Sequence, residues 1–127
     1  MKKINKLYMN IPIIRMVFQP IFENTMKHGL RGVDDGYINV NAWNRDDIIY
    51  ISITDNGKGM EQDALEELQG MLDSGADIDN QRKAIGLLNV NRRLKLYYGK
   101  DFGISVSTPK NGGFCTTVRI KESPDKM

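Results

Sequence analysis

The spacing of apolar residues along this chain switches between a helical and a strand period. Over residues 12–28 apolar side chains recur about every 3.6 residues, which predicts an amphipathic helix. The apolar stripe of this helix comprises Ile14, Val17, Phe18 and Ile21. Pro12 suits its first turn and Gly29 suits its end.

Strand patterns occur in two pairs. Polar and apolar residues alternate over 37–43, and a second run rich in β-branched residues follows at 48–54. A turn at 44–47 separates them, so we expect a hairpin. Two further strands, 103–108 and 114–120, flank a Lys-Asn-Gly-Gly turn.

Two helices are predicted between these hairpins. Residues 61–70 begin with acidic side chains, which the helix dipole favours. Residues 86–98 form the second helix, which ends at Gly99. Its predicted apolar face comprises Leu87, Val90, Leu94 and Tyr97. Residues 71–84 are polar and show no period, so we expect a lid-like loop there without a metal site.

The order of these elements predicts an α+β fold. Strand pairs joined by hairpins, with helices that can cover only one face, indicate a two-layer α/β sandwich rather than a doubly wound fold. We expect one domain over residues 1–127, with a mixed, mostly antiparallel sheet covered on one face by about three helices.

Composition narrows the classes of partner. The 18 basic and 16 acidic residues are mixed along the chain without a basic stripe, so we predict no nucleic-acid binding. A single cysteine, Cys115, excludes an intramolecular disulfide and fits a reducing compartment. The N-terminal Met-Lys-Lys-Ile-Asn-Lys lacks a following apolar region, so it is not a signal peptide, and no apolar run approaches the length of a membrane span.

The polar face of the first helix concentrates four chemically distinct side chains. Glu23, Asn24, Lys27 and His28 lie within a turn and a half. An amide oxygen can ligate Mg²⁺ and an ammonium group can pair with phosphate, so this set suits a metal-bound phosphate. The alternative is an ordinary solvated helix face. A kink is expected at Pro20, just before these side chains. A kink there favours the binding-site interpretation, because it can orient the polar cluster towards a ligand.

A second candidate site follows the strand at 48–54. In Asp55-Asn-Gly-Lys-Gly-Met60, the Asn-Gly pair could be a hairpin turn, but a predicted helix follows instead of a strand. A carboxylate at a strand end can accept a hydrogen bond from an exocyclic amine such as that of adenine. Gly86 opens a helix whose N-terminus could hold phosphate oxygens, or is simply a flexible joint. The chain has no P-loop motif.

Four motifs occur in a specific order. They are Glu-Asn-x-x-Lys-His-Gly at 23–29, Asp-x-Gly-x-Gly-Met at 55–60, Ile-Gly-Leu-x-Asn-Val-x-x-Arg-Leu at 85–94 and Gly-x-x-Thr-Thr-Val at 113–118. Residues 11–121 thereby resemble the GHKL ATPases, which have the Bergerat ATP-binding fold. Gln-Pro before Ile-Phe-Glu-Asn makes the chain similar to the catalytic domain of LytS/YesM-type sensor histidine kinases.

This resemblance implies ATP and Mg²⁺ as cofactors and assigns roles to the first motif. Asn24 would be the Mg²⁺ ligand, and Glu23 would be the catalytic acid that polarises the attacking group. Lys27 and His28 would contact the phosphates.

The remaining motifs imply the adenine and lid contacts. Asp55 would bind the adenine amine, helped by a water that Thr116 holds, while Gly57 and Gly59 shape the loop. Met60 would line the ring pocket.

The third motif implies that Gly86 and Leu87 belong to the lid hinge at the phosphates. Two departures from the family pattern replace small residues: Ala84 is expected to restrict the lid, and Cys115 to crowd the floor near Thr116. Neither removes a ligand atom, so we expect binding to survive.

The resemblance also implies a function and partners. The chain would transfer the γ-phosphoryl group of ATP to a histidine on its own upstream dimerisation domain, and so act indirectly on a response regulator. The only histidine present, His28, lies in the ATP motif. We expect a monomeric, cytoplasmic domain of a homodimeric parent in the bacterial cell membrane. The alternatives are a regulatory nucleotide-binding module without transfer activity and a GHKL serine kinase of the anti-sigma type.

Overall fold

The described part of the chain contains one sheet and a layer of helices. The computed structural model describes residues 18–23, 25–26, 30, 32–74, 85–110 and 112–121. Its elements, in chain order, are β1 (Ile38–Arg45), β2 (Ile48–Asp55), α3 (Gln62–Ser74), α4 (Ile85–Tyr98), β3 (Gly103–Ser107) and β4 (Phe114–Lys121). A helical segment at 18–23 precedes them. Within the described ranges, this order agrees with the predicted one.

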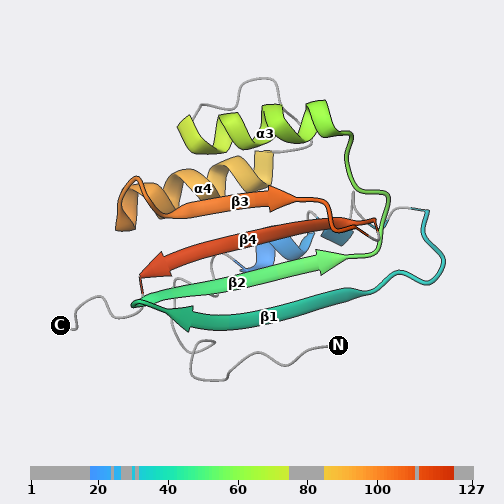
Figure 1. Cartoon of the computed structure of the whole chain (residues 1–127), viewed down its shortest axis with the longest axis horizontal. Coiled ribbons are helices and arrows are strands. Elements are labelled where there is room, and N and C mark those ends of the chain that lie inside the picture. The colour runs from blue at the N-terminus through green and yellow to red at the C-terminus, as the bar shows by residue number, and fades with distance from the viewer. Residues whose placement is uncertain are drawn as a thin grey trace.

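The sheet has the strand order β1-β2-β4-β3, and each described pairing is antiparallel. Helices α3 and α4 pack on β3, α4 also reaches β4, and the segment 18–23 lies behind β2 and β4 (Figure 1). Both central strands are therefore covered on the face that the helices share. The predicted α+β sandwich is confirmed.

A single hydrophobic core fills the space between the two layers. Strand residues facing the helices alternate with residues on the open face, as the strand period of two requires. The largest fully buried apolar side chains are Ile21, Ile49, Ile53, Leu72, Leu87, Leu88, Leu94, Ile104, Ile120 and Val118. Ile21 comes from the segment 18–23, so this segment belongs to the same core as the sheet and both helices.

The hairpin between β1 and β2 closes more tightly than predicted. Its turn consists of Asp46 and Asp47 alone, with φ of 52° and 66°. Two successive positive φ angles define a type I′ turn, whose twist matches that of antiparallel strands, and Asp is among the residues that tolerate this conformation. The predicted four-residue turn was therefore too long, and β1 extends to Arg45.

Helix α3 continues past the predicted end at Gly70. It runs to Ser74, and Leu72 in its last turn is fully buried. A Cβ at Gly70 would meet nothing within 4 Å, so this glycine is a solvent-facing helix position rather than a stop. Residues 71–74 are thus not part of a loop, and residues 75–84 lie outside the described ranges.

The predicted apolar face of α4 was wrong at one position. Tyr97 is 68% exposed, while Leu88 is fully buried. The Tyr98 ring instead packs towards Phe102, with centroids 5.7 Å apart. The buried face of α4 therefore includes Leu88 and leaves Tyr97 in solvent.

Two side-chain amides join the helices to the free edge of β3. Asn91 Oδ1 accepts a hydrogen bond from the Ile104 N–H at 2.9 Å, and Asn91 Nδ2 donates to the Leu72 carbonyl at 2.8 Å. Gln69 Oε1 accepts from the Val106 N–H at 2.8 Å. Edge-strand groups that would otherwise lack a partner are thereby satisfied. No helix within the described ranges has the length and apolar content needed to cross a membrane.

Candidate functional site

Asp55 is a buried carboxylate at the end of β2. Its side chain is 3% exposed, and Oδ1 accepts a hydrogen bond from the Gly57 N–H at 2.7 Å. Burial raises the pKa of the carboxyl group, while backbone N–H donors from Gly57 and Phe114 oppose this by lowering it. The backbone thus holds the carboxylate in a fixed orientation at the strand end.

Two glycines allow the loop after β2 to lie directly on the chain entering β4. Gly59 has φ of 76° and Gly113 has φ of 94°. A Cβ on Gly59 would lie 2.6 Å from the Gly113 carbonyl oxygen, and a Cβ on Gly113 would collide with the Asp55 carbonyl. Only glycine permits this approach, so the Asp55 loop and the start of β4 form one unit.

Asn56 fixes the same loop from its other side. Its Oδ1 accepts a hydrogen bond from the Tyr37 N–H at 2.8 Å, and its Nδ2 donates to the Asp35 carbonyl at 3.0 Å. In the sequence, Asn56 stands out only as part of a possible Asn-Gly hairpin turn, and the structure excludes that alternative because the chain continues into α3. An amide that bridges two distant backbone groups leaves no periodic signal, so this role was missed.

Thr116 faces the same side of the sheet as Asp55. Asp55 pairs with Phe114, and Thr116 lies two residues further along β4, opposite Ile53. Its side chain is 1% exposed. The two residues are therefore diagonal neighbours on the helix-covered face.

Cys115 lies on the opposite face. Its thiol accepts a hydrogen bond from Thr54 Oγ1 at 3.2 Å, and side chains of successive strand residues point to opposite sides. The prediction that Cys115 crowds the floor near Thr116 was wrong for this reason.

The other predicted residues divide between loop and helix. Met60 is 37% exposed in the loop after β2. Gly86 is the second residue of α4, and the Leu87 side chain lies in the core. Ala84 lies outside the described residues, so its expected effect stays a prediction.

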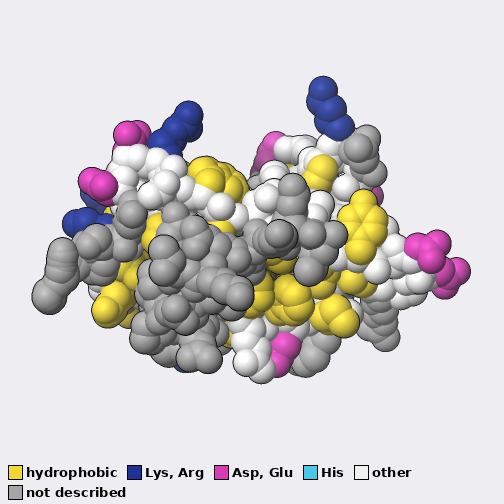
Figure 2. All heavy atoms as spheres, turned by 90° about the horizontal axis from the view of Figure 1, so that it is seen from below, with side chains coloured by type: hydrophobic (Ala, Val, Ile, Leu, Met, Phe, Trp, Pro, Cys, Tyr) yellow, Lys and Arg dark blue, Asp and Glu magenta, His cyan; other side chains and the backbone are white. Residues whose placement is uncertain are grey.

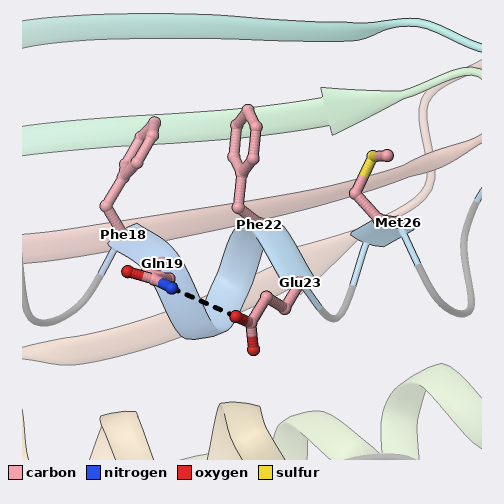
Figure 3. Close-up of a pocket in the computed structure, with 5 residues that line it drawn as sticks. All are labelled: Phe18, Gln19, Phe22, Glu23 and Met26. Carbon is pink, nitrogen blue, oxygen red and sulfur yellow. Dashed lines mark hydrogen bonds between the residues drawn. The ribbon is translucent and has the colours of Figure 1, made fainter.

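Glu23 borders an open pocket of about 470 Å³ on the segment 18–26. Its carboxylate accepts a hydrogen bond from Gln19 Nε2 at 3.2 Å (Figure 3). Phe18, Phe22 and Met26 project to one side of the segment, and the two rings stack with centroids 5.0 Å apart (Figure 3). An acid therefore sits beside an apolar surface.

Asn24, Lys27 and His28 lie outside the described residues, so their predicted roles remain untested. Within the described ranges, no group of three His, Cys, Asp or Glu side chains could hold a metal ion. In the view from below, from the side of β1, the Lys and Arg side chains that can be seen stand at the rim of the molecule, some beside Asp or Glu (Figure 2). The prediction of no nucleic-acid partner stays a prediction.

A family model described as histidine kinase-, DNA gyrase B- and HSP90-like ATPase matches residues 9–124. Among curated relatives, sensor protein LytS of Oceanobacillus iheyensis is 30% identical over 107 residues, which are 82% of this chain and 18% of LytS. Sensor histidine kinase YpdA of Escherichia coli K12 is 28% identical over 96 residues, covering 75% of this chain and 16% of YpdA. The chain thus spans less than a fifth of either sensor protein.

The chain is also similar to a kinase that is named for a serine acceptor. Serine-protein kinase RsbW of Listeria monocytogenes is 28% identical over 107 residues, covering 81% of this chain and 67% of RsbW. Among solved structures, a nucleotide-free catalytic domain of histidine kinase ThkA has a TM-score of 0.60 at 14% identity. That alignment covers 87% of this chain and 70% of the ThkA domain, which establishes the same fold.

Proposed function

Since the chain belongs to the family of histidine kinase-, DNA gyrase B- and HSP90-like ATPases, as a domain of the histidine kinase type, we propose that it binds ATP with Mg²⁺ and transfers the γ-phosphoryl group to a histidine on a separate dimerisation domain. Asp55 carries the proposal: a buried carboxylate at a strand end, held by backbone N–H groups in a loop that only glycines permit.

The adenine side of the proposed site is built on Asp55 and Thr116. Asp55 Oδ1 accepts a hydrogen bond from the Gly57 N–H, and since the two oxygens of a carboxylate can together accept about four hydrogen bonds, the group can also accept from an adenine amine. Thr116 lies diagonally across on the same face, where its hydroxyl could hold a water between the strands. Met60, partly exposed in the adjoining loop, would cover the ring. These residues fit a purine that presents an exocyclic amine.

The phosphate side is built on the first helix. Asn24 would ligate Mg²⁺, and Lys27 and His28 would pair with phosphate oxygens. The bound ion would neutralise phosphate charge. Glu23 would orient the acceptor imidazole and take its proton. Because the Leu87 side chain packs in the core, any contact of Gly86 and Leu87 with phosphate would fall to their backbone.

The partners follow from the sensor relatives. A protein of which this chain is less than a fifth would supply the dimerisation domain with its phosphoacceptor histidine, as a homodimer in the bacterial cell membrane. The chain itself would be cytoplasmic, and a response regulator would receive the phosphoryl group afterwards.

A second candidate is transfer to a serine of a separate protein. It is supported by the similarity to RsbW, of which the chain covers 67%, against 18% of LytS. The Gln19-Pro20 pair before the Glu-Asn motif favours the histidine kinase reading instead. The two candidates share the ATP site and differ in the acceptor.

Single-turnover transfer tests the proposal. The chain is mixed with labelled ATP, Mg²⁺ and the dimerisation domain of a LytS-type sensor. Asn24→Ala should abolish Mg²⁺-dependent binding, because the ion loses a protein ligand. Glu23→Gln should bind ATP normally and slow transfer by at least about 100-fold, the range of general base catalysis. Adjacent helix residues point about 100° apart, so the two variants should not share one defect.

The controls separate the candidates. Glu61→Gln removes an exposed acid outside the site and should transfer at the wild-type rate. Phosphohistidine is acid-labile and phosphoserine is acid-stable, so the stability of the product identifies the acceptor. If the chain binds ATP but transfers phosphoryl to neither acceptor, it is a regulatory nucleotide-binding module. Glu23→Gln transferring at the wild-type rate would remove the assigned role.

A further inference from the structure

We propose that Gln19 is a positioning residue for Glu23: its side-chain amide holds the Glu23 carboxylate in the orientation in which this group takes the proton of the acceptor imidazole. The inference rests on the proposed function, in which Glu23 is the base, and it adds a residue to that site. The Gln-Pro pair before the Glu-Asn motif is the only sequence pattern that involves Gln19.

The contact between the two side chains is the first observation. Gln19 Nε2 donates a hydrogen bond to Glu23 Oε2 at 3.2 Å, and the two groups point towards each other in Figure 3. An ionised carboxylate can only accept hydrogen bonds, so the amide must present its NH₂ group to Glu23. The carboxylate keeps further acceptor sites, so Glu23 can also accept from an imidazole N–H.

The surroundings of Glu23 are the second observation. Gln19 and Glu23 are both exposed and border the pocket, whose other described lining residues are the apolar Phe18, Phe22 and Met26. Among these lining residues, Gln19 is the one whose side chain can donate a hydrogen bond to Glu23. An exposed carboxylate without such a donor would sample several rotamers, whereas a base must lie within hydrogen-bond reach of the proton it takes.

The geometry of the helix is the third observation. Regular α-helical spacing over 18–23 places Gln19 one turn before Glu23. Beyond Glu23, Thr25 and Met26 lie in a π-helical turn, and the Leu30 N–H donates to the Thr25 carbonyl five residues earlier at 3.0 Å. Gln19 therefore links Glu23 to the regular part of the helix, just before the helical period changes.

A similar pair elsewhere in the protein provides a matched control. Gln62 Nε2 donates to Glu66 Oε2 at 2.9 Å, at the same spacing on α3. Both of these side chains are exposed, and neither lines the pocket. The Gln19–Glu23 pair is therefore distinguished by its place beside the pocket and not by the type of hydrogen bond.

The steps of the proposed transfer define what the loss of Gln19 should change. One imidazole nitrogen forms a bond to the γ-phosphorus while the bond from that phosphorus to the β–γ bridging oxygen breaks, and its electron pair leaves on ADP. The proton on the other imidazole nitrogen passes to the Glu23 carboxylate. Gln19 itself exchanges no atom in these steps, so its loss should lower the rate of transfer and leave the affinity for ATP unchanged.

Single-turnover transfer over a range of ATP concentrations tests the inference, with Mg²⁺ and the dimerisation domain of a LytS-type sensor. Gln19→Met keeps the length and helix propensity of the side chain but removes the donor. Its maximal rate should fall about tenfold, within the loss of about 100-fold that a misplaced reacting group can cause, at an unchanged half-saturating ATP concentration. Gln19→Glu should be at least as slow, because it sets a second carboxylate beside Glu23. Gln62→Met should transfer at the wild-type rate.

Combining Gln19→Met with Glu23→Gln is the decisive arm. The double variant should transfer as slowly as Glu23→Gln alone, because Gln19 acts only through the Glu23 carboxylate. A further loss equal to that in the wild-type background would show that Gln19 supports the structure and does not position Glu23.

Failure of the inference and failure of the proposed function give different results. If Glu23→Gln slows transfer while Gln19→Met transfers at the wild-type rate, the positioning role is wrong and the proposed function stands. If Glu23→Gln also transfers at the wild-type rate, both are wrong. A Gln19→Met variant that loses affinity for ATP at an unchanged maximal rate would overturn the positioning role as well.

Discussion

At the scale of single residues, burial of the Asp55 carboxylate at the end of β2 carries a cost to the stability of the fold. Burial raises the pKa of its carboxyl group above the ordinary value of an aspartate. A carboxyl group whose pKa is raised in the folded state contributes stability below the unfolded pKa, and this contribution is lost as pH rises through the folded pKa. At neutral pH the ionised side chain therefore opposes folding. A buried carboxylate that lowers the stability of the fold is more easily explained by a role in ligand binding than by a structural role.

We predict that Asp55→Asn separates binding from stability. The amide oxygen can still accept from the Gly57 N–H, but the other terminal atom becomes an NH₂ group that would face the adenine amine donor to donor. Affinity for ATP should fall at least about tenfold, the effect of a lost polar contact with an unpaired group left behind. Calorimetry with ATP and GTP measures this, and selectivity should move towards GTP, which presents a carbonyl there.

The stability of the same variant checks the sign of the pKa shift. Its melting temperature at neutral pH should equal or exceed that of the wild type. The advantage should shrink as pH falls through the raised folded-state pKa of the wild-type carboxyl group, because protonation removes the cost of burying its charge. A variant that is clearly less stable than the wild type at pH 7 would show that Asp55 is a structural residue.

Gly59 and Gly32 form a matched pair for testing the close approach of the Asp55 loop. Their φ angles are 76° and 78°, but a Cβ meets the Gly113 carbonyl at 2.6 Å in the first case and nothing within 4 Å in the second. We predict that Gly32→Ala costs about 1 kcal/mol for its backbone conformation alone, and Gly59→Ala about 3 kcal/mol or more. Urea unfolding followed by circular dichroism would compare them. Equal costs would contradict the backbone contact.

At the scale of elements, the sequence predicted those helices and strands that a regular spacing of apolar residues indicates. The four strands, the α3 and α4 helices and their order follow from runs of period two and 3.6. The end of α3 was missed because residues 71–84 are polar and show no helical period, whereas burial of Leu72 extends the helix to Ser74. The position of Cys115 was wrongly predicted, although the alternation of side chains along a strand alone places Cys115 and Thr116 on opposite faces of the sheet. The amides of Gln69 and Asn91 could not be predicted, since tertiary partners of polar side chains leave no pattern.

We predict that Asn91 is the main polar link between α3, α4 and β3. Asn91→Leu would leave the Leu72 carbonyl and the Ile104 N–H without their partner in a buried setting, costing about 3 kcal/mol of unfolding free energy. Asn89→Leu, at an exposed position of the same helix, should change stability by less than about 0.5 kcal/mol. Denaturant unfolding measures both. Similar losses for the two variants would mean that Asn91 contributes through helix propensity alone.

At the scale of the whole molecule, the proposed site draws on parts of the chain far apart in sequence. Asp55 ends β2, Thr116 lies on β4, Gly86 lies in the first turn of α4 and Glu23 belongs to the first helical segment. The order of motifs indicated these residues together, but their spatial relation depends on the pairing of β2 with β4, which no local pattern specifies. A ligand that contacts all of them can bind only the assembled fold.

We therefore predict that nucleotide raises the melting temperature of the whole chain and that this shift depends on the metal. A ligand at 100 times its dissociation constant stabilises the folded state by about 2.7 kcal/mol, which corresponds to about 10 °C for a domain of this size. Thermal unfolding with ATP and Mg²⁺ should show this shift, and removing the metal with a chelator should reduce it if Asn24 binds nucleotide through Mg²⁺. The Asp55→Asn variant should lose most of the ATP-dependent rise in melting temperature. GTP should give little shift, because its carbonyl would face the Asp55 carboxylate; an equal shift with GTP and ATP would remove Asp55 from adenine recognition.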